Sequence, residues 1–283
     1  MSDIDTPRRP GPWDPRPEDV RAPAPPAHGL ARPVDGALDK GQHPLWALVS
    51  TLLLGGLIYY WSGSLVIVAA VLFGLLVHEY GHVLAMNRLG MGPARIYIVP
   101  FLGGLAKGQR MPASEWYGVL VALAGPAFGL LAAIPFFGAY LWTGQTIWLG
   151  GVLAIAFINL INLAPAPPLD GSKALGPVLA RIHPMVEKVA LLAVGGLAVA
   201  WGVSNGSWLF AGFLAFALFG HLRRGAWRPE GRRLTWGEAA KSTVLFVLTV
   251  AACVGVGLAA LLPGLDTVSE GLTHGARLFE FGR

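Results

Sequence analysis

Long apolar stretches recur along most of the chain, separated by short polar connections. A run of about 20 apolar residues can cross ~30 Å of hydrocarbon as a helix. Seven runs approach or exceed this length: residues 45–60, 65–89, 116–142, 147–164, 186–203, 208–222 and 243–262. The sixth run is short enough to form a tilted or partly buried helix. The pattern therefore predicts an all-α polytopic membrane protein with about six to seven transmembrane helices.

Both ends of the chain depart from this pattern. Residues 1–43 are rich in Pro, Arg and Asp and nearly lack large apolar side chains, which predicts a disordered tail. They also lack the apolar segment and small-residue cleavage site of a secretory signal, so the first run is expected to remain as a span. The predicted organisation is a tail at 1–43, a transmembrane domain at 44–262 and a second tail at 263–283.

Composition agrees with a membrane class. Of 283 residues, 54% are hydrophobic and 13% are charged, which is more apolar than a water-soluble core requires. The single cysteine, Cys253, lies in the last apolar run, where no intrachain disulfide is possible and no function is assigned.

Charge placement favours one orientation, because Lys and Arg of short loops collect on the cytoplasmic side. The connections near Ser62, Thr143 and Asn205 carry no charge. Basic residues instead follow the second, fourth and sixth runs: Arg88, Arg95, Lys107, Arg110, Lys173, Arg181, Lys188, Arg223, Arg224, Arg228, Arg232, Arg233 and Lys241. This predicts a cytoplasmic N-terminus and, with seven spans, a C-terminus outside. The net charge of +5 then reflects basic loops beside anionic headgroups, and no nucleic-acid partner is expected.

The candidate chemistry lies at the end of the second run, in LLVHEYGHVLAMNRLG. Residues four apart share one face of a helix, so His78 and His82 could present two imidazole nitrogens to one zinc ion, with Glu79 near the bound water. H-E-x-x-H alone also occurs in proteins without zinc. Three ionisable side chains in an apolar span are costly unless paired, hydrated or metal-bound, which favours the metal. Counting from Arg88 at about 1.5 Å per residue places His82 and His78 roughly 9 and 15 Å inside the membrane.

A tetrahedral catalytic zinc needs a third protein ligand. Asp170, in FINLINLAPAPPLDGSKAL, is an acidic residue set into an apolar, proline-rich stretch. The alternative interpretation makes it the N-cap of a following helix, since small and polar residues come next. The prolines Pro165, Pro167 and Pro168 are expected to break the fourth helix. Unpaired backbone at membrane depth is tolerated beside protein or a water-filled cavity, so a site could open there.

Together these segments resemble the site-2 protease family of intramembrane zinc metalloproteases. Its signature pairs H-E-x-x-H in an early span with N-x-x-P-x-x-P-L-D-G in a later one, which here starts at Asn162. The resemblance implies that His78, His82 and Asp170 ligate one Zn²⁺ per chain. It also implies that Glu79 is the general base and that Asn162 holds the substrate chain or the oxyanion. Taken alone, Asn162 is better explained as a polar residue bonding between helices.

Two further segments fit this resemblance. In RIYIVPFLGGLAKGQ, residues 96–99 read as a β-strand and the glycines at 103–104 as a turn or bulge, which predicts a small membrane-associated hairpin near the active site. An interfacial re-entrant loop is the alternative. The edge of such a sheet could pair with an unwound substrate. In LAGPAFG, Gly125 and Gly129 indicate close helix packing, and Pro126 indicates a bend in the third helix.

Two other functions remain open. A different class of membrane zinc protease joins H-E-x-x-H to a downstream Glu, for which Glu187, Glu230 and Glu238 are available. An inactive relative or a polytopic transporter could use the metal structurally or bind client helices without cutting, because transporters also use broken helices and midplane ionisable groups. Glu79, which a structural zinc does not need, and the lack of internal repetition favour the protease.

The expected protein is thus a zinc metalloendopeptidase with its catalytic core at about residues 65–182, cutting a transmembrane segment in the cytoplasmic half of the lipid bilayer. The resemblance implies a single-span membrane protein as substrate. The loops are too short for a soluble sensor domain. Regulation of substrate access is therefore expected from the N-terminal tail, from the Arg-rich loop at residues 223–241 or from a separate regulatory membrane partner. Compact size and short loops favour a prokaryotic plasma (inner) membrane.

Overall fold

The computed structural model describes residues 41–100, 103–224 and 231–263. All of these belong to one compact unit, residues 31–283. The predicted tails at 1–43 and 263–283 lie almost wholly outside the described residues, so their disorder stays a prediction. The described ranges form helices and one two-stranded sheet.

The first two helices are joined by a two-residue turn. α1 (Pro44–Ser62) ends at Gly63, whose φ of 62° suits a residue without a side chain at a helix end. Ser64 then caps α2 (Leu65–Arg88), because its hydroxyl accepts a hydrogen bond from the N–H of Ile67. The short turn brings the two helices into contact.

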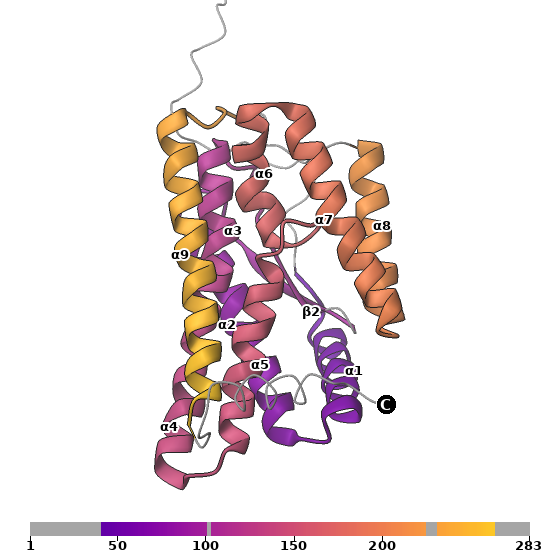
Figure 1. The fold of residues 1–283 in the computed structure, drawn as a ribbon, viewed down its shortest axis with the longest axis vertical. Helices are drawn as coiled ribbons and strands as arrows, with labels where there is room; N and C mark the ends of the chain where they lie inside the picture. The colour runs from indigo at the N-terminus through magenta and orange to yellow at the C-terminus, as the bar shows by residue number, and fades with distance from the viewer. Residues whose placement is uncertain (1–40, 101–102, 225–230, 264–283) are drawn as a thin grey trace, which may run out of the picture. The chain divides into compact units, whose positions relative to one another are not determined.

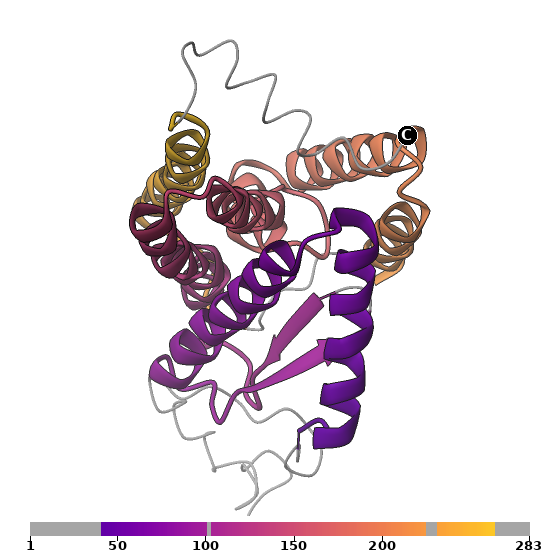
Figure 2. The same cartoon turned by 90° about the horizontal axis from the view of Figure 1, so that it is seen from below.

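An antiparallel hairpin follows α2. β1 (Arg95–Val99) pairs with β2 (Gly103–Lys107), with Ile98 opposite Gly104. The predicted strand is confirmed, whereas both glycines belong to β2 and not to the turn. Gly103 has a φ of 114°, a conformation that a strand can accommodate at glycine. The sheet lies between α1 and α2 (Figure 2).

The third apolar run is helical throughout but changes helix type. α3 (Glu115–Gly129) passes through Pro126 and is followed by a 3₁₀ turn at Leu130–Ala132 and by α4 (Ala133–Thr143). The irregularity predicted at the proline therefore lies just beyond it, where the helix tightens.

The fourth run forms a broken helix, as the prolines predict. α5 (Ile147–Asn162) ends before the irregular segment 163–169, and α6 (Asp170–Ile182) begins directly after it. α2 contacts both α3 and α5, so the segment that carries both histidines lies among the other helices.

The last three helices are α7 (Pro184–Ser204), α8 (Trp208–Arg224) and α9 (Trp236–Leu261). α7 packs on α8, and α9 runs beside α3 and α5 (Figure 1). Within the described ranges, five helical segments are long and apolar enough to cross a membrane, namely α1, α2, the α3–α4 run, α7 and α9. α5 and α8 are apolar but shorter. The chain is therefore an all-α polytopic membrane protein, with a span count close to the prediction.

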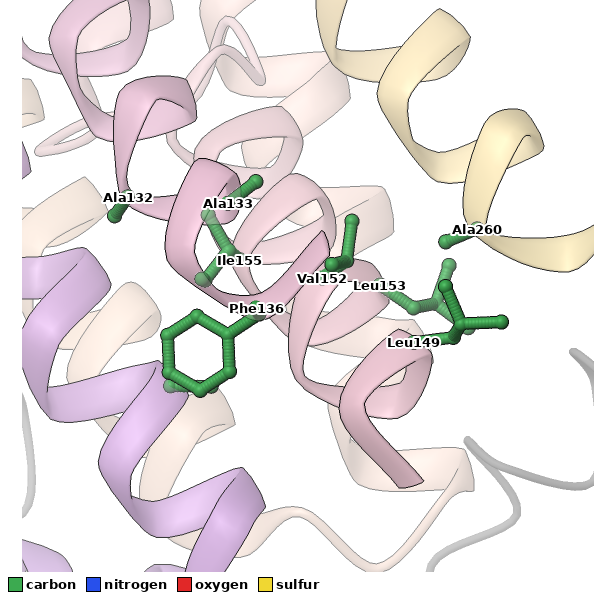
Figure 3. Packing of buried hydrophobic residues seen from close by; sticks show 9 residues of the cluster. Ala132, Ala133, Phe136, Leu149, Val152, Leu153, Ile155 and Ala260 are labelled. Atoms are coloured by element: carbon green, nitrogen blue, oxygen red, sulfur yellow. The ribbon is translucent and has the colours of Figure 1, made fainter. Parts of the chain in front are cut away.

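Small side chains allow close packing in two buried apolar clusters. Phe136 of α4 belongs to the first cluster, together with small residues of neighbouring helices (Figure 3). The members of this cluster are Ala70, Ala132, Ala133, Phe136, Leu149, Val152, Leu153, Ile155 and Ala260. The second cluster joins α3, α6 and α9: Val119, Ala122, Leu123, Leu163, Ala174, Leu234 and Cys253. The thiol of Cys253 thus packs as an apolar group.

The segment before α9 is tied to the start of α3. The buried carboxylate of Glu115 accepts a hydrogen bond from the N–H of Leu234 at 2.9 Å, and the N–H of Glu115 donates to the carbonyl of Arg232 at 3.0 Å. Thr235 and Glu238 form a capping box at the start of α9. This part of the predicted Arg-rich loop is therefore anchored to the start of α3, which packs on α2.

Candidate metal centre

His78 and His82 lie one turn apart on the buried face of α2, as their spacing predicts. They are 2% and 6% exposed. Their rings meet edge to face with centroids 4.8 Å apart, and the two Nε2 atoms are 3.1 Å apart. The helix therefore presents two imidazole nitrogens to one position.

Asp170 reaches the same position from the start of α6. Leu169 is the N-cap of that helix, and Asp170 is its first residue. No side chain caps the helix; instead, Asp170 Oδ2 lies 3.1 Å from each of the histidine Nε2 atoms. The N-cap alternative for Asp170 is therefore wrong, because its carboxylate is directed at the histidines.

The two remaining ring nitrogens fix the protonation of the imidazoles. A carbonyl oxygen can only accept, so His82 Nδ1–H donates to the carbonyl of Val121 at 2.7 Å. Asn159 donates its amide to the carbonyl of Ile155 at 2.8 Å, which turns Asn159 Oδ1 toward His78. His78 Nδ1–H then donates to that oxygen at 2.9 Å. In the neutral imidazoles, both Nε2 atoms are consequently acceptors.

Three acceptor atoms thus converge in a buried space, an arrangement that calls for a cation or a proton between them. The described residues contain this one group that could hold a metal ion, His78, His82 and Asp170. Two ligand atoms of a tetrahedral zinc lie roughly 3.3–3.5 Å apart for bonds of about 2.0–2.1 Å. The three separations of 3.1 Å come close to that value. The donor set and its spacing therefore fit zinc.

Glu79 lies beside this group and faces the hairpin. It is 6% exposed, and its Oε2 has no hydrogen-bond partner among the described residues. Gly104 of β2 packs on its side chain so closely that a Cβ at that position would collide with Glu79. An unpaired buried carboxylate next to a candidate metal group is suited to holding a water or substrate atom.

Comparison with known proteins agrees with this chemistry. Residues 66–149 match the model of peptidase family M50, a range that includes His78, Glu79 and His82. A Synechocystis protein named "Putative zinc metalloprotease sll0528" is 34% identical over 149 residues, 48% of this chain and 39% of the relative. Over residues 66–149 the chain is therefore similar to the site-2 protease family. No solved structure matches it. The matched stretch spans about two fifths of the curated relative's length.

Glycines explain why α2 and α3 can pack so closely. A Cβ on Gly81 of α2 would collide with the backbone of Ala124. A Cβ on Gly125 would meet His82 and His78 at their Nε2 atoms, and one on Gly129 would meet the amide of Asn159. The interpretation of Gly125 and Gly129 as packing residues is confirmed. Gly125 packs against the two histidines, and Gly129 packs against Asn159, which bonds to His78.

Gly171 likewise allows close packing, on the other side of the site. A Cβ there would collide with the carbonyl groups of Leu163 and Ala164. The segment that follows α5 therefore folds back directly on the start of α6. This contact holds Asp170 at the histidines, and it accounts for the glycine of the L-D-G motif in physical terms.

Asn162 and Asn159 differ in what they contact. Asn162 donates its side-chain amide to the carbonyl of Ile158 at 3.1 Å, within its own helix. Asn159, one turn earlier, supports His78 and is 1% exposed. Sequence reasoning missed Asn159, although a second polar residue in an apolar helix beside the motif was an available signal. The assignment of Asn162 to catalysis stays a prediction.

The acidic residues of the alternative protease class lie elsewhere. Glu187 is buried at the start of α7, beside Gly176 of α6. Glu238 pairs with Arg232 and caps α9. Glu230 lies outside the described residues. Neither described glutamate belongs to the group of potential metal ligands.

Proposed function

We propose that this chain is an intramembrane zinc metalloendopeptidase that cleaves transmembrane segments of other membrane proteins. The observation that carries the proposal is the convergence of three buried acceptor atoms, from His78, His82 and Asp170, beside the unpaired carboxylate of Glu79. A purely structural zinc site would be closed by a fourth protein ligand, and it would not need a buried carboxylate next to it.

His78, His82 and Asp170 would hold the metal ion in this proposal. Zinc bound there would polarise the substrate carbonyl and lower the pKa of a bound water to about 7. Asn159 and the carbonyl of Val121 orient the two rings, because each accepts the Nδ1 proton of one histidine. Lys173 lies 3.4 Å from Asp170 Oδ1, leaving Oδ2 to face the histidines.

Glu79 is the general base in this proposal. Its carboxylate takes a proton from the water that attacks the peptide carbonyl and passes it to the leaving amine. Asn162 retains a second amide hydrogen beyond the one it donates to Ile158, and this hydrogen could hold the substrate chain or the oxyanion. Both roles follow from the family motif, and Glu79 also directly follows the proposed ligand His78 on the buried face of α2.

The proposed substrate is a single-span membrane protein. A transmembrane helix hides its amides in internal hydrogen bonds, so it must unwind before a peptide bond can be reached. Apart from the Ile98 groups that Gln42 occupies, the hairpin beside Glu79 offers strand edges that could replace some of those bonds. Basic residues in the loop after α2 and in α6 support a cytoplasmic location of this end of the protein, in a prokaryotic plasma membrane.

The deciding experiment measures zinc content and cleavage together on purified protein, with a panel of tagged single-span substrates in liposomes. Wild type is expected to hold about one zinc per chain and to cut. Glu79→Gln should retain zinc and lose cleavage, and Asp170→Ala should lose both. His183→Asn, which keeps a capping side chain at the start of α7, is the matched histidine control and should behave as wild type. Zinc binding without cleavage of any substrate would favour an inactive relative or a client-binding protein.

A further inference from the structure

A cavity of about 410 Å³ lies between α1, α2 and the hairpin. α1 contributes Thr51 and Leu54 to its wall, and α2 contributes Ala69 and Leu72. Among the residues that the structure describes, Glu79 is the one ionisable residue that lines it. Figure 2 shows the three elements that surround this space. The cavity therefore reaches from an apolar interior to the proposed general base.

The residues that line the cavity favour binding of an apolar side chain. Thr51 donates its hydroxyl to the carbonyl of Ala47 at 2.8 Å, so this hydroxyl is already engaged within α1. The other lining residues, apart from Glu79, have apolar side chains or are glycines. A polar side chain entering this space would lose its hydrogen bonds to water without replacement.

The hairpin wall of the cavity is held in place. Ile98 donates its N–H to Gln42 Oε1 at 2.7 Å and accepts from Gln42 Nε2 at 2.8 Å through its carbonyl. One side-chain amide thus occupies both outward-facing backbone groups of Ile98, as a neighbouring strand would. Ile98 is opposite Gly104, so both lie on the same face of the sheet, toward the cavity and Glu79. The wall is therefore preformed next to the proposed site of attack.

The volume of the cavity limits the size of the group that it can hold. Ligand sites in proteins are commonly about 300–1,000 Å³ in volume, so this cavity is at the small end of that range. A folded helix, about 10–12 Å in diameter with its side chains, needs more space. One large side chain of an unwound segment fits these limits.

We propose that the cavity is the subsite for a large apolar side chain of the substrate next to the scissile bond. The inference rests on the proposed peptidase function and adds its specificity: residues such as Leu or Phe are preferred at one position beside the cut, and Gly or Ala is disfavoured there. Ala69 is the point at which the subsite can be narrowed, because it lines the cavity and is exposed to it.

The test compares wild type with Ala69→Phe, using a substrate series that carries Gly, Ala, Leu, Phe or Trp at each position flanking the cut. Wild type should cut Leu and Phe substrates best. Ala69→Phe should lower kcat/KM for these by roughly tenfold to a hundredfold and leave the Ala substrate within about threefold. Ala200→Phe, at an exposed position of α7 away from the cavity, is the matched control and should keep the wild-type preference.

Binding to the Glu79→Gln variant separates this inference from the peptidase function. The Glu79→Gln variant should bind substrates with Leu or Phe beside the cut more tightly than those with Gly or Ala. This preference should disappear when Ala69→Phe is added, even if the wild type cuts nothing in the panel. Equal effects of Ala69→Phe on every substrate, in cleavage or in binding, would overturn the subsite, because a cavity filled by lipid or needed only for packing gives no dependence on side-chain size. Cleavage by wild type with no side-chain preference would overturn the subsite and leave the peptidase function standing.

Discussion

Asn159 Oδ1 accepts a hydrogen bond from His78 Nδ1 at 2.9 Å, on the side of the ring opposite the nitrogen that faces His82 and Asp170. The bond joins α5 to α2 across 81 positions of sequence. It fixes both the tautomer and the orientation of the imidazole, so the candidate metal group depends on a residue that is not itself one of the proposed ligands.

Replacing Asn159 with Ala should lower zinc affinity by roughly 10–100-fold, the usual effect of removing a partner of a ligating histidine. Competition with a chelator of known affinity measures this. Asn159→Asp retains an acceptor for His78 Nδ1 and should recover part of the loss. Asn162→Ala, one turn further along α5, is the control and should keep zinc, since Asn162 bonds to Ile158. Equal zinc affinity in wild type and Asn159→Ala would contradict the positioning role.

Gly125→Ala should abolish zinc binding while leaving the protein folded. The added methyl group would occupy space beside both Nε2 atoms, where the ion has to lie. Zinc content and circular dichroism of the purified variant test both parts. Gly118→Ala on the same helix is the matched control, because no atom lies within 4 Å of its added Cβ and alanine favours a helix over glycine. A zinc-replete Gly125→Ala would show that the site is looser than the structure indicates.

Gln42→Ala should loosen the hairpin. The two hydrogen bonds to Ile98 together stabilise it by about 1–3 kcal/mol, at about 0.5–1.5 kcal/mol each. Hydrogen exchange over residues 95–99 should therefore speed up, which mass spectrometry can follow. Gln42→Glu cannot donate to the Ile98 carbonyl, so it should give an intermediate rate. Gln145→Ala, in the exposed turn before α5, should leave the exchange of these amides unchanged; similar protection in all variants would argue against the contact.

The basic loops predict a topology that single cysteines can report. The native Cys253 is buried and should stay silent to an impermeant maleimide. In sealed cells, Gln145→Cys and Asn205→Cys should react, because they lie in uncharged loops. Arg110→Cys and Arg233→Cys should react after permeabilisation. The reverse pattern would place the N-terminus outside.

The sequence predicts the parts of the site that depend on local spacing. His78 and His82 share a helix face because they are four residues apart, and the prolines after Asn162 end α5 where Asp170 is needed. Apolar runs predict most helix ends to within a few residues, since length and hydropathy decide whether a segment can cross a bilayer. The exception is α9, which begins at Trp236, well before the apolar run at 243–262.

What the sequence could not predict depends on contacts between distant segments. Asn159 becomes functional only because α5 packs on α2. Gly104 is typical of a turn by propensity, yet it lies in a strand, where the side chain of Glu79 leaves no room for a Cβ. The cavity has walls from three separate elements, so no single stretch of sequence carries its signature.

The position of Asp170, 88 residues after His82, bears on how the protein is made. At synthesis rates of about 5–20 residues per second, roughly 4–18 seconds separate the two halves of the ligand set on the ribosome. During that interval α2 carries only two of the three ligands. Under the proposed function, metal capture, and with it peptidase activity, would therefore wait until α6 has joined the assembly. The bound ion would then close a long loop of chain and act as a late cross-link on an otherwise finished fold.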